Sequence, residues 1–161
     1  MRQPLDALWR LALICAYRLV CVYWFLRRPT LYGVYVALWH RGRILLIWNS
    51  YKQSASLPGG GIGRGEGAVE AASRELREEA GIALPPASLR EVAAYTGFVA
   101  WHTEHARFFE AVLEIEPGVA IDRREVVAAR FATPEEALAL PLAPLVRRYL
   151  LARGAVPARS D

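Results

Sequence analysis

The sequence from Gly60 to Ile82 reads GGIGRGEGAVEAASRELREEAGI, a glycine-rich run that leads into a segment of helical periodicity. The glycines between positions 59 and 65 predict a loop, because glycine adopts turn conformations that other residues avoid. We expect the helix to run from about Gly67 to Ala80. Gly81 suits the C-terminal cap of this helix, and Pro85 prevents its continuation.

Three carboxylates fall on one face of the predicted helix. Glu75, Glu78 and Glu79 are spaced by three and four residues, which brings their side chains together on a helix. Like charges at this spacing repel each other, so a helix built only for stability would avoid them. Mg²⁺ offsets such repulsion, because it takes oxygen ligands and is commonly shared between carboxylates and substrate phosphates. The plainer interpretation is a solvated helix laced with Arg–Glu salt bridges.

The spacing of these residues resembles the Nudix box, G-x5-E-x7-R-E-U-x-E-E-x-G-U with U aliphatic, and every specified position is met. Leu57-Pro58-Gly59 resembles the family's usual lead-in. The resemblance implies an α/β/α sandwich around a mixed sheet. It also implies a Nudix pyrophosphohydrolase that cleaves the diphosphate of a nucleoside diphosphate linked to another moiety, with Mg²⁺ or Mn²⁺. The alternative is a catalytically silent domain of this fold that binds a nucleotide and regulates.

The resemblance assigns roles to individual residues of the box. Glu78 and Glu79 match the principal metal ligands, and Glu75 matches a further ligand or the general base. The backbone carbonyl of Gly59 matches a main-chain metal ligand of some members. Arg74 belongs to the expected catalytic set as a clamp, because a guanidinium fixes neighbouring carboxylates through bidentate bonds.

Other positions near the box carry weaker expectations. Gly60 and Gly61 are expected to let the backbone approach the substrate closely. Glu66 is expected to pair with Arg74 or to favour the helix start. The aromatic side chains that might stack on a base do not distinguish themselves from core residues; they are Trp48, Tyr51, Tyr95, Phe98 and Trp101.

A further carboxylate is expected from outside the box. Glu125, which precedes a late strand, is the best-placed candidate for a catalytic ligand or base, and Glu104 is the alternative. A surface carboxylate beside two arginines would look the same at position 125. His102 and His105 are interpreted as part of a polar loop, because two histidines alone do not make a metal-site pattern.

The remaining chain alternates helical and strand patterns, which indicates an α+β domain. Strands are expected at residues 31–40 and 43–48, joined as a hairpin, and at 91–100, 106–115 and 125–131. Residues 101–105 are expected to be a connection. Thr133-Pro134-Glu135-Glu136 predicts a helix start, and residues 142–152 predict a last helix.

The N-terminal stretch from residue 5 to 26 is strongly apolar, and it is interrupted by Arg10 and Arg18. It predicts an extra helix that packs on the domain or mediates a homodimer, lies in a membrane interface as a peripheral contact, or spans a membrane. We therefore divide the chain into a helix at 1–28, a Nudix domain at 29–156 and a frayed tail at 157–161.

Composition limits the classes of partner. The chain has 161 residues and is 54% hydrophobic, which suits one domain with a core and excludes disorder. The net charge is +4, but the arginines are scattered, so a nucleic-acid partner is not expected. Cys15 and Cys21 are expected to be free thiols, which favours a cytoplasmic protein with a membrane-associated alternative. The expected partner is a small nucleotide-like molecule.

Overall fold

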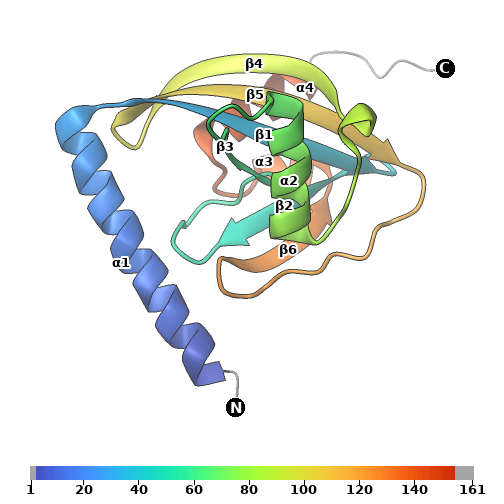
Figure 1. The fold of residues 1–161 in the computed structure, drawn as a ribbon. Helices are drawn as coiled ribbons and strands as arrows, with labels where there is room; N and C mark the ends of the chain where they lie inside the picture. Colours follow the sequence, from blue (N-terminus) through green and yellow to red (C-terminus); the bar gives the residue numbers. More distant parts are fainter. Residues whose placement is uncertain (1–2, 155–161) are drawn as a thin grey trace.

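The structure is a computed structural model that describes residues 3–154 (Figure 1). The chain begins with α1 (Gln3–Arg27), β1 (Thr30–His40), β2 (Arg43–Asn49), β3 (Gly59–Gly61) and α2 (Ala68–Ala80). It continues with the short helix η1 (Pro86–Ser88), β4 (Arg90–Val99), β5 (His102–Leu113), β6 (Val126–Ala132), α3 (Pro134–Leu138) and α4 (Pro144–Gly154). The tail expected at 157–161 lies outside the described residues.

The six strands form one mixed sheet in the order β4-β5-β1-β2-β6, with β3 pairing β1 on the side. β1 and β2 make the expected hairpin, in which His40 pairs with Arg43. β1 and β5 are parallel over the whole length of β1, whereas the other pairs are antiparallel. This mixed pairing confirms the predicted fold class.

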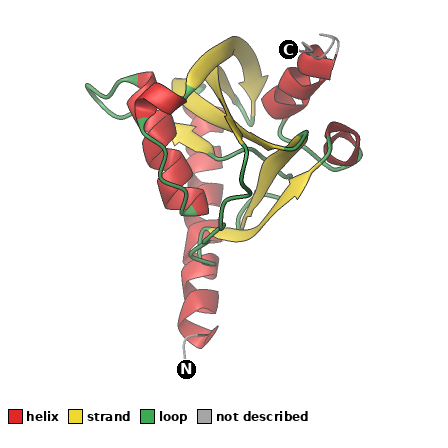
Figure 2. Ribbon diagram, turned by 90° about the vertical axis from the view of Figure 1, so that its right-hand side faces the viewer, coloured by secondary structure: helices red, strands yellow, loops and turns green. Residues whose placement is uncertain are grey.

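Two apolar clusters make the core, one on each face of the sheet. Helices lie on both faces of the sheet, as Figure 2 shows. One face is covered by α2, through Ala72, Leu76 and Ala80, all fully buried. The other face is covered by α3 and α4, where Val146 and Leu150 are buried against the strands. Helices therefore lie on both sides of the sheet, which gives the α/β/α sandwich that the resemblance implied.

Two predictions of local structure were wrong. Residues Gly59–Gly61 form the short strand β3, and glycine is required there because a Cβ on Gly59 would lie 2.1 Å from the carbonyl oxygen of Val34. The expected connection at 101–105 is much shorter, since β5 already begins at His102. Ala100 and Trp101 make the turn with φ of 45° and 72°, and neither residue type signals such a turn in a sequence.

The capping predictions are confirmed at both predicted helices. Gly81 ends α2 in the left-handed region, with φ 69°, and its N–H donates to the carbonyl of Arg77 at 3.0 Å. Thr133 caps α3, where its side chain accepts from the N–H of Glu136 while the Glu136 carboxylate accepts from the N–H of Thr133.

Helix α1 extends away from the sandwich and contacts it along one side (Figure 1). Asp6 pairs with Arg124 at 3.2 Å, and the Arg10 guanidinium donates twice to the carbonyl of Arg123, at 2.9 and 2.7 Å. The outer side of α1 is apolar and exposed; its large side chains include Leu8, Leu11, Leu19, Val22, Tyr23 and Leu26. Helix α1 therefore contacts the domain through one side and leaves its other side exposed.

Candidate active site

Helix α2 places the box carboxylates at the edge of the sheet beside β3. Its apolar side is anchored in the core, which turns Glu75 and Glu79 toward the glycine strand. A Cβ on Gly60 would lie only 2.5 Å from Oε1 of Glu75. Glycine at position 60 therefore lets the Glu75 carboxylate lie directly against the strand backbone.

Arg74 holds three glutamates with one guanidinium. It donates to both carboxylate oxygens of Glu66, at 2.8 and 3.0 Å, in a bidentate pair. Its Nη1 donates to Glu75 at 2.7 Å and to Glu78 at 3.2 Å, and its Nη2 donates to the carbonyl of Gly61 at 3.0 Å. The structure thus places Arg74 as the expected clamp, tying α2, β3 and the intervening loop together.

Glu66 has the local role expected for it. One of its carboxylate oxygens also accepts from the N–H of Gly63 at 2.7 Å. The hydrogen bonds from Arg74, together with that from Gly63, lower the pKa of Glu66 to about 2. Glu66 is therefore ionised at neutral pH and serves as a counter-charge for Arg74.

Glu79 is the most buried of the box glutamates, with 8% of its surface exposed. Its carboxylate accepts from the N–H of Gly59 at 2.7 Å and from Nδ2 of Asn49 at 3.1 Å. Burial, with smaller contributions from the nearby Glu75 and Glu125, raises the pKa of Glu79 to about 7 against the effect of these two bonds. Burial also raises the pKa of Glu75. Negative charge is thus unfavourable here without a compensating cation.

The predicted carboxylates border a small cavity of about 60 Å³. It is lined by Glu75, Glu78, Glu79, Asp122, Glu125 and Val126. Glu125, the carboxylate expected from outside the box, is therefore brought to the same site, where it accepts from the Tyr51 hydroxyl at 2.7 Å. Asp122 was missed by the sequence analysis. Its side chain accepts from the N–H groups of Arg124 and Glu125, so its sequence signal is that of an ordinary turn.

The donor set of this cavity has the chemistry that a hard cation takes, since carboxylate oxygens are the preferred ligands of Mg²⁺. Within residues 3–154, however, no three His, Cys, Asp or Glu side chains already enclose a point where an ion would sit. Three of these carboxylates are instead hydrogen-bonded to other side chains: Arg74 donates to Glu75 and Glu78, and the Tyr51 hydroxyl donates to Glu125. The residues present fit a cation by type and by charge.

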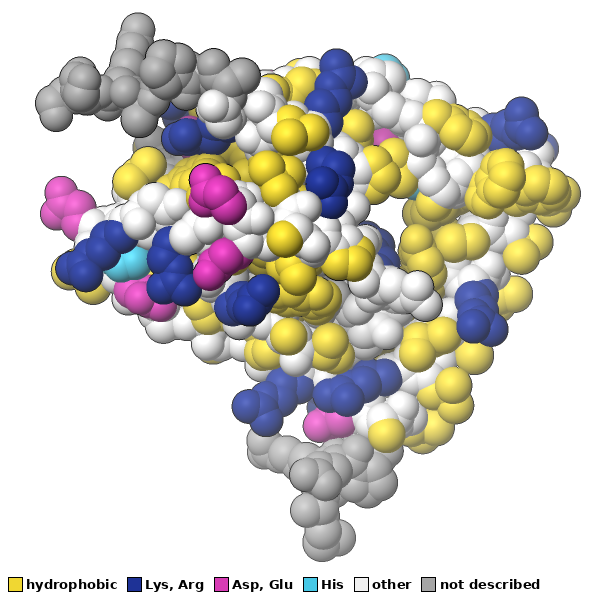
Figure 3. Space-filling view, turned by 180° about the vertical axis from the view of Figure 1, so that it is seen from behind, with side chains coloured by type: hydrophobic (Ala, Val, Ile, Leu, Met, Phe, Trp, Pro, Cys, Tyr) yellow, Lys and Arg dark blue, Asp and Glu magenta, His cyan; other side chains and the backbone are white. Residues whose placement is uncertain are grey.

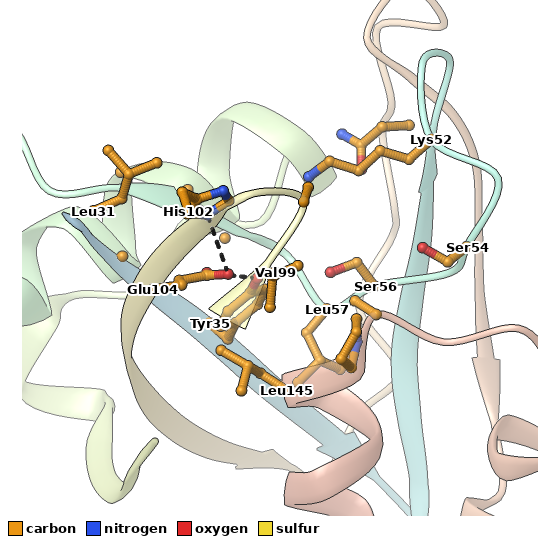
Figure 4. A pocket seen from close by; sticks show the side chains of 18 of the residues that line it. Leu31, Tyr35, Lys52, Ser54, Ser56, Leu57, Val99, His102, Glu104 and Leu145 are labelled. Atoms are coloured by element: carbon orange, nitrogen blue, oxygen red, sulfur yellow. Dashed lines mark hydrogen bonds and ion pairs between the residues drawn. The ribbon is translucent and has the colours of Figure 1, made fainter. Parts of the chain in front are cut away.

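A larger cavity of about 830 Å³ adjoins the glycine strand. Gly59, Gly60 and Gly61 line it, and Gly60 and Gly61 are the two glycines that were expected to lie close to the substrate. Glu104 belongs to this cavity and not to the carboxylate cluster; it accepts from the Tyr35 hydroxyl at 2.9 Å (Figure 4). The expected alternative to Glu125 therefore has a different location.

A three-layer mixed-sheet fold with an acidic helix held by an arginine beside a cavity is the arrangement expected of the Nudix class. The NUDIX domain model matches residues 29–153, and the chain belongs to this family. The predicted family is thus confirmed, and α1 lies outside the matched residues.

Solved structures of the same fold support the assignment. The MutT NUDIX hydrolase from Burkholderia pseudomallei is 24% identical over 76% of this chain and 96% of its own, with a TM-score of 0.67. The E. coli ORF135 protein is 26% identical over 83% and 96%, with a TM-score of 0.66. The NUDIX domain of Shewanella oneidensis NrtR, solved with ADP ribose, is 19% identical over 78% and 88%, with a TM-score of 0.68. No curated protein matches this chain.

Proposed function

We propose that this protein is a metal-dependent Nudix pyrophosphohydrolase that cleaves the diphosphate bond of a nucleoside diphosphate linked to another moiety. One observation carries the proposal: the complete set of Glu75, Glu78 and Glu79 borders the acidic cavity, with Arg74 holding two of the three. Such a cluster is costly for stability alone. The larger cavity offers room for the organic part of the substrate, as the NrtR domain has room for ADP ribose.

The metal of this proposal is Mg²⁺, with Mn²⁺ as the alternative. Glu75, Glu78 and Glu79 would hold it, with the Gly59 carbonyl as a main-chain ligand. When bound, the ion supplies charge neutralisation for the diphosphate and lowers the pKa of a water. Burial raises the pKa of Glu79, and a bound cation would lower it again, because a nearby positive charge favours the ionised carboxylate.

The remaining groups position the reactants. Glu125 is the candidate general base, since its carboxylate lines the acidic cavity and bonds to no cationic side chain of residues 3–154. The Tyr51 hydroxyl orients it. Burial and the bond to Glu125 raise the pKa of Tyr51, so the phenol remains a donor. Gly60 and Gly61 allow the substrate to approach the backbone of β3.

A substrate panel tests the proposal. The purified full chain is assayed with Mg²⁺ or Mn²⁺ on nucleoside triphosphates, nucleotide sugars, dinucleoside polyphosphates and dinucleotides. We expect hydrolysis of at least one class and its loss in Glu79→Gln, with Glu135→Gln on α3 as the control. No turnover of any class, together with tight nucleotide binding by calorimetry, would establish the alternative of a silent regulatory domain.

For the outer side of α1 we propose a cytoplasmic membrane surface as the partner. The helix is long and apolar enough to cross a membrane, by length and composition only, and its apolar side chains are exposed along one side of the molecule (Figure 3). Exposed Arg18, Arg27 and Arg28 complement anionic lipid. A homodimer through residues 5–26 is the competing outcome. Free Cys15 and Cys21 agree with a reducing compartment.

A further inference from the structure

Helix α1 contributes to the larger cavity although it lies outside the residues that match the family. Tyr17 and Trp24 of α1 line this cavity together with residues of β1, β3 and β5. The Tyr17 ring lies 4.9 Å from that of Tyr51, and the Trp24 ring lies 4.2 Å from that of His102. These centroid distances are those of packed aromatic pairs. The inner side of α1 is thus an aromatic wall of the cavity.

Contacts along the helix keep this wall in place. At the N-terminal end, Asp6 pairs with the Arg124 side chain and Arg10 donates to the backbone carbonyl of Arg123. At the C-terminal end, Phe25 packs edge-on against Trp101 at 5.1 Å. Tyr17 and Trp24 therefore sit between two anchoring points, while the opposite side of the helix is exposed.

Two hydrogen-bonding side chains, His102 and Glu104, lie beside the aromatic wall. His102 is buried, with 6% of its surface exposed, and its Nδ1 has no hydrogen-bond partner among the described residues. Its Nε2 lies 3.9 Å from Oε2 of Glu104, whose other oxygen accepts from Tyr35 (Figure 4). The Nδ1 atom of His102 is shielded from solvent, so the Glu104 carboxylate, which lines the cavity, is the hydrogen-bond acceptor that this end of the cavity offers to a ligand. This end of the cavity suits a planar group with polar atoms on its edge.

We propose that α1 completes the substrate site, with Tyr17 and Trp24 as specificity-determining residues that contact the planar base of the substrate. Glu104 then accepts a hydrogen bond from the polar edge of that base, and His102 lies behind Glu104 and Trp24. The inference rests on the proposed function for its substrate class. It assigns to α1 a part in recognition in addition to any contact of its outer side.

Equilibrium binding to the full chain tests this role. ADP, GDP, CDP, UDP and inorganic pyrophosphate are titrated by calorimetry in Mg²⁺ into the wild type, Trp24→Leu and Tyr17→Leu. Tyr23→Leu is the matched control, because Tyr23 is an exposed aromatic residue of the same helix. We expect the two cavity variants to bind the preferred nucleoside diphosphate about tenfold more weakly, equivalent to about 1.4 kcal/mol. Pyrophosphate binding and the Tyr23→Leu variant stay within about twofold of the wild type.

The outcomes separate the inference from the proposed function. Wild-type nucleotide affinity in both cavity variants, equal loss of pyrophosphate binding, or no nucleotide binding by the wild type would overturn the inference. Circular dichroism checks the fold, and Trp24→Phe is expected to restore most of the affinity. If nucleotide binding depends on α1 but nothing is hydrolysed, the proposed function fails while the inference stands. If a substrate is hydrolysed with unchanged KM in both variants, the proposed function stands and the inference fails.

Discussion

The metal-free protein is expected to lose stability as the pH rises through neutrality, and Glu79 is the main cause. Burial raises the pKa of this carboxyl from 4.5 in the unfolded chain to about 7 in the folded one. Between these values the folded state binds more protons than the unfolded state, so the free energy of unfolding falls as pH rises. The stabilisation is complete below about pH 4.5 and is lost above about pH 7.

The size of the effect follows from the shift. A rise from 4.5 to about 7, at about 1.4 kcal/mol per pKa unit, corresponds to about 3 kcal/mol of unfolding free energy. Glu79→Gln removes the titration while keeping the shape of the side chain. Because Asn49 can turn its amide to accept as well as to donate, the glutamine keeps a partner beside the N–H of Gly59. The variant is thus expected to be more stable than the wild type at pH 8 without metal.

Urea unfolding in EDTA at several pH values from 5 to 8 measures this difference. All other ionisable groups are the same in the two proteins, so the difference between wild type and Glu79→Gln isolates position 79. Adding Mg²⁺ at pH 8 should stabilise the wild type more than the variant. Parallel pH profiles for the two proteins, or a wild type that gains stability toward pH 8 relative to the variant, would refute the reasoning.

Three further predictions concern the clamp, the glycine strand and α1. Arg74→Lys, which loses the bidentate pair with Glu66, should lower activity or Mg²⁺ affinity by about 10- to 100-fold, whereas Arg77→Lys on the same helix should not. Gly60→Ala should lower kcat strongly, because its Cβ would meet the Glu75 carboxylate at 2.5 Å. Gly118→Ala, which lies outside the site and has open space around its Cβ, is the matched control and should keep wild-type activity. Flotation with anionic vesicles should retain the full chain, and Leu19→Glu should weaken that retention; retention unchanged by the substitution, or concentration-dependent dimers in light scattering without vesicle binding, would contradict the membrane partner.

The parts of this site that the sequence predicted are those set by local periodicity. One helix carries the three glutamates on one face, the arginine just before Glu75 and the capping glycine at its end. The spacing along the sequence therefore places all of them. The strand at Gly59–Gly61 was not predictable from the sequence. Its pairing with β1 requires backbone proximity at Gly33, and glycine runs predict loops when that partner is unknown.

The position of Glu104 shows why the cavity itself was not predictable. A connection at 101–105 would have left this residue in a loop, but the two-residue turn at Ala100 and Trp101 extends β5 by several residues. Glu104 then lies opposite Gly97 of β4 and beside Leu31 of the parallel strand β1. Its distance from the box carboxylates is thus decided by strand register, which depends on residues far apart in the chain.

The two sides of helix α1 were also not distinguishable from the sequence. Its apolar pattern describes only which side chains avoid water, and it does not distinguish a face that covers a cavity from one that meets a lipid. The structure separates the two by their partners: Tyr17 and Trp24 meet aromatic rings of the domain, whereas Leu19 and Leu26 meet none of the described side chains closely enough to be buried. One helix can therefore recognise substrate with one side and bind a surface with the other. The Trp24→Leu and Leu19→Glu variants should affect these two properties independently, because the residues lie on opposite sides of α1.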